Sequence, residues 1–184
     1  MTPKTLRTLT NILLTSCLVG APVMTSAQDK NANPFTGVVK DAWTSMKGNI
    51  AAAATAMPEN EYSFKPVPEV RSFGQIVGHL ANEHYGICSA AKGEKNPKDG
   101  TDFEKTTAKA DLLKALTESI AYCDATFAAA TDKTAFDPVE LFGSKFTKLR
   151  ALELNVTHDG EHYGNFVTYM RLKGHVPPTS AGTR

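Results

Sequence analysis

The sequence is poor in the features that mark nucleic-acid-binding, membrane-embedded and repetitive proteins. Its 20 basic residues are balanced by 19 acidic ones, for a formal net charge of +1 at pH 7, so it has no basic surplus for binding nucleic acid. Beyond an N-terminal segment it has no long apolar run, which excludes a membrane-spanning helix from the rest of the chain. No internal repeat interrupts its 184 residues, a length that indicates one domain.

The N-terminal 27 residues differ in character from the remainder. Lys4 and Arg7 give a basic start, a short apolar stretch follows, and small residues occupy positions 25–27. This is the pattern of a secretory signal peptide. We expect residues 1–27 to be removed, which leaves a single domain over 28–184 in a periplasmic or secreted bacterial protein. An N-terminal amphipathic helix that stays in the fold is the alternative.

Cysteine is also scarce, with three in the whole chain. Removal of the signal peptide leaves Cys88 and Cys123, and an even pair in an oxidising compartment favours a disulfide. Two buried thiols that never meet are the alternative. No C-x-x-C spacing is present, which disfavours a cysteine-bound metal.

Runs of β-branched residues that alternate with polar ones are few, so strands are not expected. Apolar residues instead recur at helical spacing. Pro34 begins one such segment and Pro58 ends it, while Ser72 and Gln75 form a capping-box signal for a second that stops at Gly93. Four helices are predicted, at 34–57, from 72 to about 92, at 108–130 and at 146–172. The fold class is therefore all-α, an antiparallel four-helix bundle.

Histidine is the most informative residue type, because the chain has only five. His158 and His162 lie four residues apart, on one face of the last predicted helix. Two imidazoles so placed can bind one metal ion if a further ligand comes from elsewhere. Histidines that merely pack in the core are the alternative reading. Helical phase favours His84 over His79 as the third ligand, and His175 in the Pro-rich tail is expected to be exposed.

The string from His158 to His162 also matches the H-x-x-E-H motif of a class of zinc proteases, with Glu161 as the base. Those enzymes take a further glutamate ligand well downstream of the motif. No acidic residue follows Glu161 in this chain. The protease interpretation is therefore rejected.

Several short segments, in order and spacing, resemble the DinB-like family of metal-binding four-helix bundles of bacteria. The resemblance covers about 35–180 and is carried by residues 56–59, 62–66, 71–73, 78–80, 88–94, 122–124, 158–165, 169–172, 174 and 177–180. It implies a metal triad of His79, His158 and His162, in place of the His84 that periodicity prefers. The two cysteines also recur in similar members, which strengthens the disulfide prediction.

By this resemblance the cofactor is a divalent metal ion, zinc or nickel first, with iron and manganese chemically reasonable. Some relatives are thiol transferases and others look like hydrolases. We expect a metal-dependent transferase or hydrolase that acts on a small molecule, with Glu83, Asp159 or Glu161 to orient a ligand or move a proton.

The competing hypothesis is a non-catalytic exported binding or stress-response module whose metal is structural or absent. A closed four-ligand site would favour that module, whereas an open three-histidine site would favour an enzyme. An exported location weakens the thiol-transferase version, because low-molecular-weight thiols are mainly cytosolic. No nucleic acid and, after signal removal, no membrane is expected as a partner, and a homodimer is compatible with the sequence.

Overall fold

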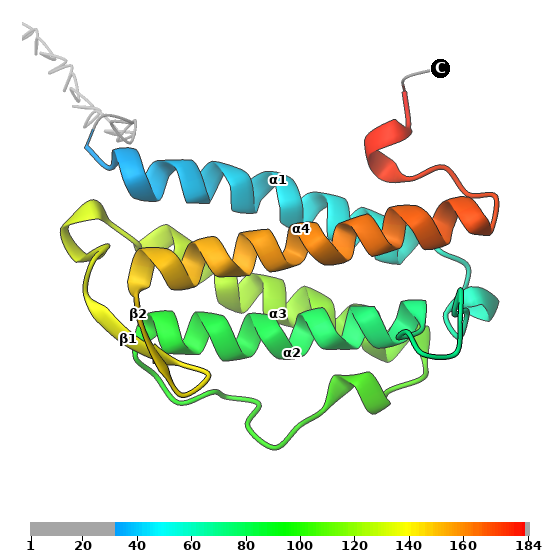
Figure 1. The fold of residues 1–184 in the computed structure, drawn as a ribbon, viewed down its shortest axis with the longest axis horizontal. Coiled ribbons are helices and arrows are strands. Elements are labelled where there is room, and N and C mark those ends of the chain that lie inside the picture. The colour runs from blue at the N-terminus through cyan, green and yellow to red at the C-terminus, as the bar shows by residue number, and fades with distance from the viewer. Residues whose placement is uncertain (1–31, 183–184) are drawn as a thin grey trace, which may run out of the picture.

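A computed structural model describes residues 32–182 as four long helices (Figure 1). The predicted signal peptide, which contains the third cysteine, Cys17, lies outside the described residues. The helices are α1 (Pro34–Ala56), α2 (Phe73–Lys92), α3 (Lys109–Ala129) and α4 (Lys148–Leu172). The predicted all-α four-helix bundle is thus confirmed, and each predicted helix end is within about two residues of the observed one. No helix in this described part is long and apolar enough to cross a membrane.

The helix boundaries follow from local chemistry. Pro34 opens α1, where its missing N–H costs no hydrogen bond. The predicted capping box is present at α2: the Ser72 side chain accepts from the Gln75 backbone, and the Gln75 side chain accepts from the Ser72 backbone. Gly93 ends this helix with φ at 73°, a left-handed conformation that costs glycine little. These signals set the rotational phase of α2 and hence the direction of its histidines.

Two pairs of contacts give the direction of the helices. The rings of Phe73 and Phe166 lie 4.4 Å apart, and His84 contacts Asp159, so α2 and α4 are antiparallel. Cys88 is joined to Cys123, and a Cβ on Gly74 would lie 3.3 Å from Leu112, so α2 and α3 are parallel, unlike the antiparallel arrangement expected from the sequence. Residues 93–108 therefore return along the length of the bundle before α3 begins (Figure 1).

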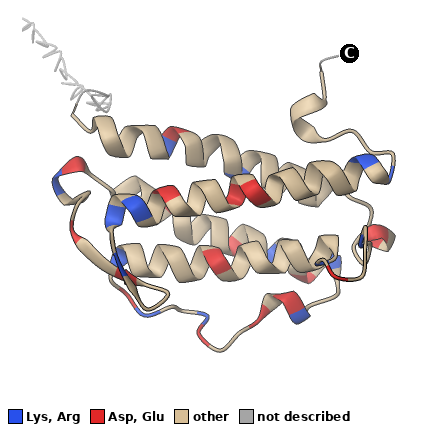
Figure 2. Ribbon diagram, viewed as in Figure 1, with Lys and Arg blue, Asp and Glu red and all other residues tan. Residues whose placement is uncertain are grey.

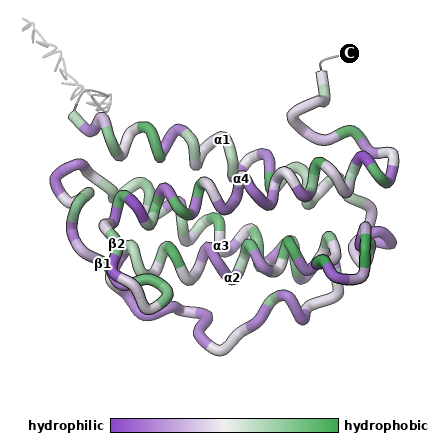
Figure 3. Tube along the Cα trace, in the orientation of Figure 1, coloured by the Kyte–Doolittle hydropathy of each residue, from purple (hydrophilic) through white to green (hydrophobic). Residues whose placement is uncertain are grey.

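The core lies between the four helices. Toward one end, Trp43 of α1 stacks on Phe127 of α3 with ring centroids 4.8 Å apart; toward the other, Phe73 packs against Phe166. Hydrophobic and hydrophilic segments alternate along each helix, as expected for one buried face (Figure 3). Acidic and basic residues are interspersed over the described chain (Figure 2).

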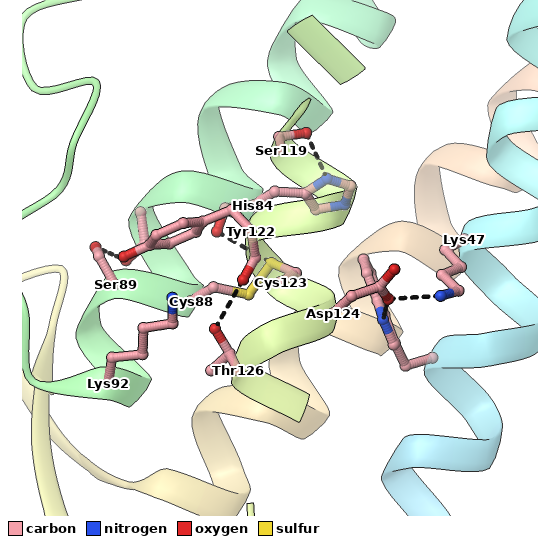
Figure 4. Close-up of a disulfide and its surroundings, with 12 residues drawn as sticks. Lys47, His84, Cys88, Ser89, Lys92, Ser119, Tyr122, Cys123, Asp124 and Thr126 are labelled. Carbon is pink, nitrogen blue, oxygen red and sulfur yellow. Dashed lines mark hydrogen bonds and ion pairs between the residues drawn. A yellow bond between two sulfur atoms is a disulfide. The ribbon is translucent and has the colours of Figure 1, made fainter. Parts of the chain in front are cut away.

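The predicted disulfide is present between Cys88 of α2 and Cys123 of α3, whose Cα atoms are 5.4 Å apart (Figure 4). Both residues are fully buried. A cross-link between positions 35 residues apart stabilises the fold by about 4 kcal/mol in the chain-entropy model. It ties together the two parallel helices that the long return segment connects.

A small hairpin was not predicted. Strands β1 (Pro138–Leu141) and β2 (Ser144–Thr147) pair in antiparallel register, where a linker was expected. Phe142 and Gly143 form its two-residue turn with φ of 52° and 72°, as in a type I′ turn. The sequence signal is weak because Phe-Gly is not among the favoured Asn-Gly or Asp-Gly pairs. Short 3-10 helices complete the structure at Glu59–Glu61, Phe103–Lys105, Asp132–Thr134 and Pro178–Ser180.

Candidate metal centre

Three histidines from two helices converge beside the core. His79 comes from α2, and His158 and His162 come from successive turns of α4. The Nε2 atom of His158 lies 3.2 Å from Nε2 of His79 and 3.2 Å from Nε2 of His162. One nitrogen of each ring falls within 4.8 Å of the others. The structure therefore brings together the triad that the family resemblance implies.

These separations suit a bound metal ion. Metal–nitrogen bonds of 2.0–2.1 Å at tetrahedral angles would place two ligand nitrogens about 3.3 Å apart, close to the spacing observed around His158. The donor set is nitrogen alone, and within residues 32–182 no fourth His, Cys, Asp or Glu belongs to the group. The residues present thus fit a divalent ion with at least one coordination position free for another ligand.

A carboxylate holds the outer nitrogen of His79. Its Nδ1 lies 2.7 Å from Oε1 of Glu104, and because an ionised carboxylate only accepts, the ring nitrogen donates. Burial alone would raise the pKa of Glu104, but hydrogen bonds from Arg71 and His79 outweigh it, so the pKa is lowered. This arrangement leaves the Nε2 lone pair of His79 directed at the other two rings, as in many carboxylate–histidine–metal sites.

A glycine allows Glu104 to reach α2. A Cβ on Gly78 would lie 2.3 Å from the carbonyl oxygen of Phe103, a distance that real atoms do not tolerate. The return segment therefore packs directly on the α2 backbone beside His79. Only glycine at position 78 permits this approach without a shift of the segment.

His162 of α4 has its own hydrogen-bond partner one turn further on. Nδ1 of His162 lies 3.1 Å from Oδ1 of Asn165, and the ring nitrogen donates because the amide oxygen only accepts. Asn165 is three residues beyond His162, on the same helical face. His162 is thus also held with Nε2 directed at the triad.

Burial favours the neutral form of two of the three rings, His79 and His158. Desolvation lowers the pKa of His79. Desolvation, followed by the nearby His162 and His79, lowers the pKa of His158 to about 3. The neutral imidazole is the form that binds a metal ion. At neutral pH these two rings therefore have no proton to release before they coordinate.

His84 and Asp159 lie together in the core and form a separate network. Ser119 Oγ lies 3.0 Å from Nδ1 of His84, and Asp159 Oδ1 lies 3.0 Å from Nε2 (Figure 4 shows the Ser119 contact). Trp43 packs edge-on against the same ring. Helical phase correctly indicated that His84 points inward, but both of its nitrogens already have partners there. Asp159 contacts His84 and not the three histidines.

The other candidate residues named from the sequence do not belong to the three-histidine group. Glu83 is one turn beyond His79 on α2, and desolvation raises its pKa. Glu161 is exposed on α4 at the edge of a pocket. His175 is partly exposed, and its Nε2 lies 2.6 Å from Glu61 Oε2. That contact fastens the tail after α4 to the segment after α1.

A pocket of about 520 Å³ opens next to the triad. His162 forms part of its wall. Tyr169, another lining residue, donates a hydrogen bond to the Arg71 carbonyl oxygen at 2.9 Å. This bond fastens the loop before α2 to α4. The size is that of a small-molecule site. The lining residues are Glu69, Val70, Arg71, Ile76, Glu161, His162, Asn165 and Tyr169.

Sequence reasoning missed three residues that support the site. Glu104 lies in a single 3-10 turn and Arg71 in a loop, segments too short for periodicity to report the direction of a side chain. Asn165 could have been found, because its spacing of three from His162 on a predicted helix places the two side chains together.

Comparison with known proteins agrees with this description. The family model of the DinB superfamily matches residues 42–165, which include all three histidines. A DinB-like protein from Bacillus cereus ATCC 10987 has a similar structure, with a TM-score of 0.65, 16% sequence identity and coverage of 76% of this chain and 93% of that one. A DinB-like protein from Bacillus subtilis has a TM-score of 0.60 and 21% sequence identity, with coverage of 76% of this chain and 93% of that one.

The mycothiol-dependent maleylpyruvate isomerase also has a similar fold. Its TM-score is 0.60 at 12% identity, over 71% of this chain and 60% of the isomerase. No functionally curated protein matches the sequence. At these identities the solved structures establish a shared fold, whereas the family model establishes membership: the chain belongs to the DinB superfamily.

Proposed function

We propose that this protein is a metal-dependent enzyme of the transferase or hydrolase type that acts on a small molecule. His79, His158 and His162 would hold the metal. The observation that carries the proposal is the convergence of three imidazole nitrogens within 4.8 Å, with one of the three rings forming part of a pocket wall.

The number of protein ligands supports catalysis over a structural role. Structural zinc sites are closed by four protein ligands, whereas catalytic sites keep a position open. The group here has three members among the described residues, and His162 borders the 520 Å³ pocket. A non-catalytic binding module would not need an open coordination position beside a cavity of substrate size.

When bound, a divalent ion supplies Lewis acidity and lowers the pKa of a coordinated water or thiol. The chain's own residues supply the rest. Glu104 and Asn165 hold the rings of His79 and His162 in place, so little reorganisation is needed during a reaction. Glu161 at the pocket edge and Glu83, whose pKa is raised by burial, are the groups proposed to accept or return a proton.

Zinc or nickel is the proposed ion. Neutral imidazoles suit zinc, copper, iron and nickel, while magnesium and calcium prefer oxygen ligands. The all-nitrogen triad therefore disfavours the latter two, and iron and manganese are the next candidates after zinc and nickel.

A thiol is one candidate co-substrate. An enzyme with this fold is described as mycothiol-dependent, and a metal-bound thiolate is a strong nucleophile. We also propose that the protein is exported, because its N-terminus resembles a signal peptide and its disulfide belongs in an oxidising compartment. Export would separate it from cytosolic thiols, which favours the hydrolase version.

The test is metal analysis of the full-length protein, expressed with its own leader and purified without a nickel column. We expect about one equivalent of a divalent ion per chain after reconstitution, and loss of that ion in His158→Ala. His175→Ala is the matched control, because it removes a histidine outside the triad and should keep the ion. The proposal is overturned if the wild-type protein binds no more metal than His158→Ala.

Activity is tested next. Metal-loaded wild type and His158→Ala would be compared on small esters and amides, and on electrophiles with an added thiol. The proposed class requires turnover by the wild type that the variant lacks. Equal turnover by both would exclude a role for this site.

A further inference from the structure

The outer nitrogen of the third ligand differs from those of the other two. Nδ1 of His79 donates to Glu104, and Nδ1 of His162 donates to Asn165. Nδ1 of His158 is buried and has no hydrogen-bond partner among the described residues. A ligand imidazole normally donates this second N–H, because the bond fixes the tautomer and the ring orientation.

Asn155 carries the other two unpartnered atoms. Within residues 32–182, the buried side-chain atoms that lack a partner are Nδ1 of His158 and both amide atoms, Nδ2 and Oδ1, of Asn155. Asn155 is only 1% exposed. All three unpartnered atoms therefore belong to two residues of α4.

The two residues are neighbours on the helix surface. Asn155 precedes His158 by three positions in α4, so their Cβ atoms are about 5–6 Å apart. Helical side chains lean toward the N-terminus of their helix, which carries the His158 ring toward the turn that holds Asn155. Their polar atoms nevertheless form no direct hydrogen bond with each other.

An amide at this position is costly unless it has a partner. One turn before it on the inward face of α4 lie the apolar residues Ala151 and Leu152, and a leucine would fill a similar volume without burying polar groups. A buried amide and a buried imidazole nitrogen without partners are destabilising. One water molecule between them would give a partner to the imidazole N–H and to the amide oxygen, because buried waters occupy polar sites with two or more partners.

We propose that Asn155 is a positioning residue for His158 and acts through one buried water. The water accepts from Nδ1–H of His158 and donates to Oδ1 of Asn155. Nε2 of His158 is then left unprotonated, facing Nε2 of His79 and His162. Each of the three ligands would thus have an outer partner, direct for two and water-mediated for the third. This inference rests on the proposed metal site.

The test is zinc affinity, measured by competition with a chromophoric chelator. Asn155→Leu should bind zinc about 10–100-fold more weakly than wild type, the usual effect of losing an outer partner, while it remains folded. Asn155→Asp should keep the affinity, because its carboxylate also accepts from the water. Thr126→Val is the control: it removes a buried hydroxyl on α3 that donates to the Tyr122 carbonyl oxygen, and zinc affinity should not change.

A second measurement needs no variant. A high-resolution crystal structure of the zinc-loaded wild type should show a water within hydrogen-bond distance of both Asn155 and Nδ1 of His158. The inference is overturned if that position holds no water, or if Asn155→Leu binds zinc as tightly as wild type. Failure of the wild type to bind zinc or any other divalent ion would instead overturn the proposed function, and the inference with it.

Discussion

Glu104 accepts a hydrogen bond from His79 across 2.7 Å, although 25 residues separate them in the chain. The contact joins the return segment to α2 and fixes which nitrogen of His79 faces the triad. Glu104 is held in turn by Arg71, whose Nε lies 2.9 Å from the other carboxylate oxygen. Two segments outside the four long helices therefore determine the orientation of a triad histidine on α2.

Removal of this carboxylate should weaken metal binding. We expect Glu104→Ala to reduce zinc affinity by about 10–100-fold, because the ring loses its orienting partner. The zinc affinity of Glu104→Gln should fall less, since the amide oxygen of the glutamine still accepts from Nδ1 of His79. Competition with a chelator measures both, and Glu140→Gln, an exposed residue of β1, is the control. Equal affinities for Glu104→Ala and Glu140→Gln would contradict the assigned role.

Gly78 should be intolerant of a side chain. In Gly78→Ala the new Cβ meets the carbonyl of Phe103, so the return segment must shift, at a cost of about 1–3 kcal/mol. Glu104 moves with that segment, and zinc affinity should fall as well. Gly86→Ala on the same helix is the control, because its Cβ meets nothing within 4 Å; it should stabilise by up to about 1 kcal/mol. Denaturant unfolding measures both effects. Equal free energies of unfolding for Gly78→Ala and Gly86→Ala would contradict the close approach assigned to Gly78.

The fold was largely predictable because helical periodicity and capping signals are local. Pro34, Ser72 with Gln75, and Gly93 act within one turn of chain, and the structure places them at helix ends as expected. The direction of α3 relative to α2 was not predictable in this way, because it depends on where residues 93–108 run. The Phe142-Gly143 turn was missed because its signal is atypical.

The candidate site also contains residues that local sequence patterns predict and residues that only tertiary contacts determine. His158 and His162 were recognised from spacing alone, because they lie on one helix. The choice between His79 and His84 required the family resemblance, since both point inward and periodicity does not report which partners face them. Glu104 was out of reach, because its position depends on a contact between the return segment and Gly78 that no local pattern encodes.

The disulfide should contribute stability without contributing to the metal site. Cys88→Ala combined with Cys123→Ala should lower the free energy of unfolding by about 2–5 kcal/mol. Zinc affinity should change little, because the bond joins α2 to α3 and α3 provides no ligand. Urea unfolding measures the free energy of unfolding, and competition with a chelator measures the zinc affinity. A reductant should destabilise the wild type and leave the double variant unaffected; equal sensitivity of the two would contradict the assignment.

Acid should destabilise the metal-free protein through His158. Its pKa is lowered from 6.5 to about 3 in the folded state. As pH falls through this window, the unfolded chain takes up a proton that the folded chain does not, so the free energy of unfolding decreases. The effect should be absent above about pH 7. His158→Gln removes the titrating group, so its unfolding free energy should depend less steeply on pH than that of the wild type. If the wild type and the variant showed the same pH dependence, the pKa of His158 would not be lowered.

His79 and His84 should respond differently to the same substitution. His79→Ala should lose zinc with little change in the stability of the metal-free protein. His84→Ala leaves Asp159 buried without its partner, which should cost about 3–5 kcal/mol, yet the folded molecules should still bind zinc. If His84→Ala is too unstable to purify, His84→Gln retains a hydrogen-bonding group beside Asp159. Zinc bound by His79→Ala but not by a folded His84 variant would reverse the ligand assignment and restore the choice that helical periodicity favours.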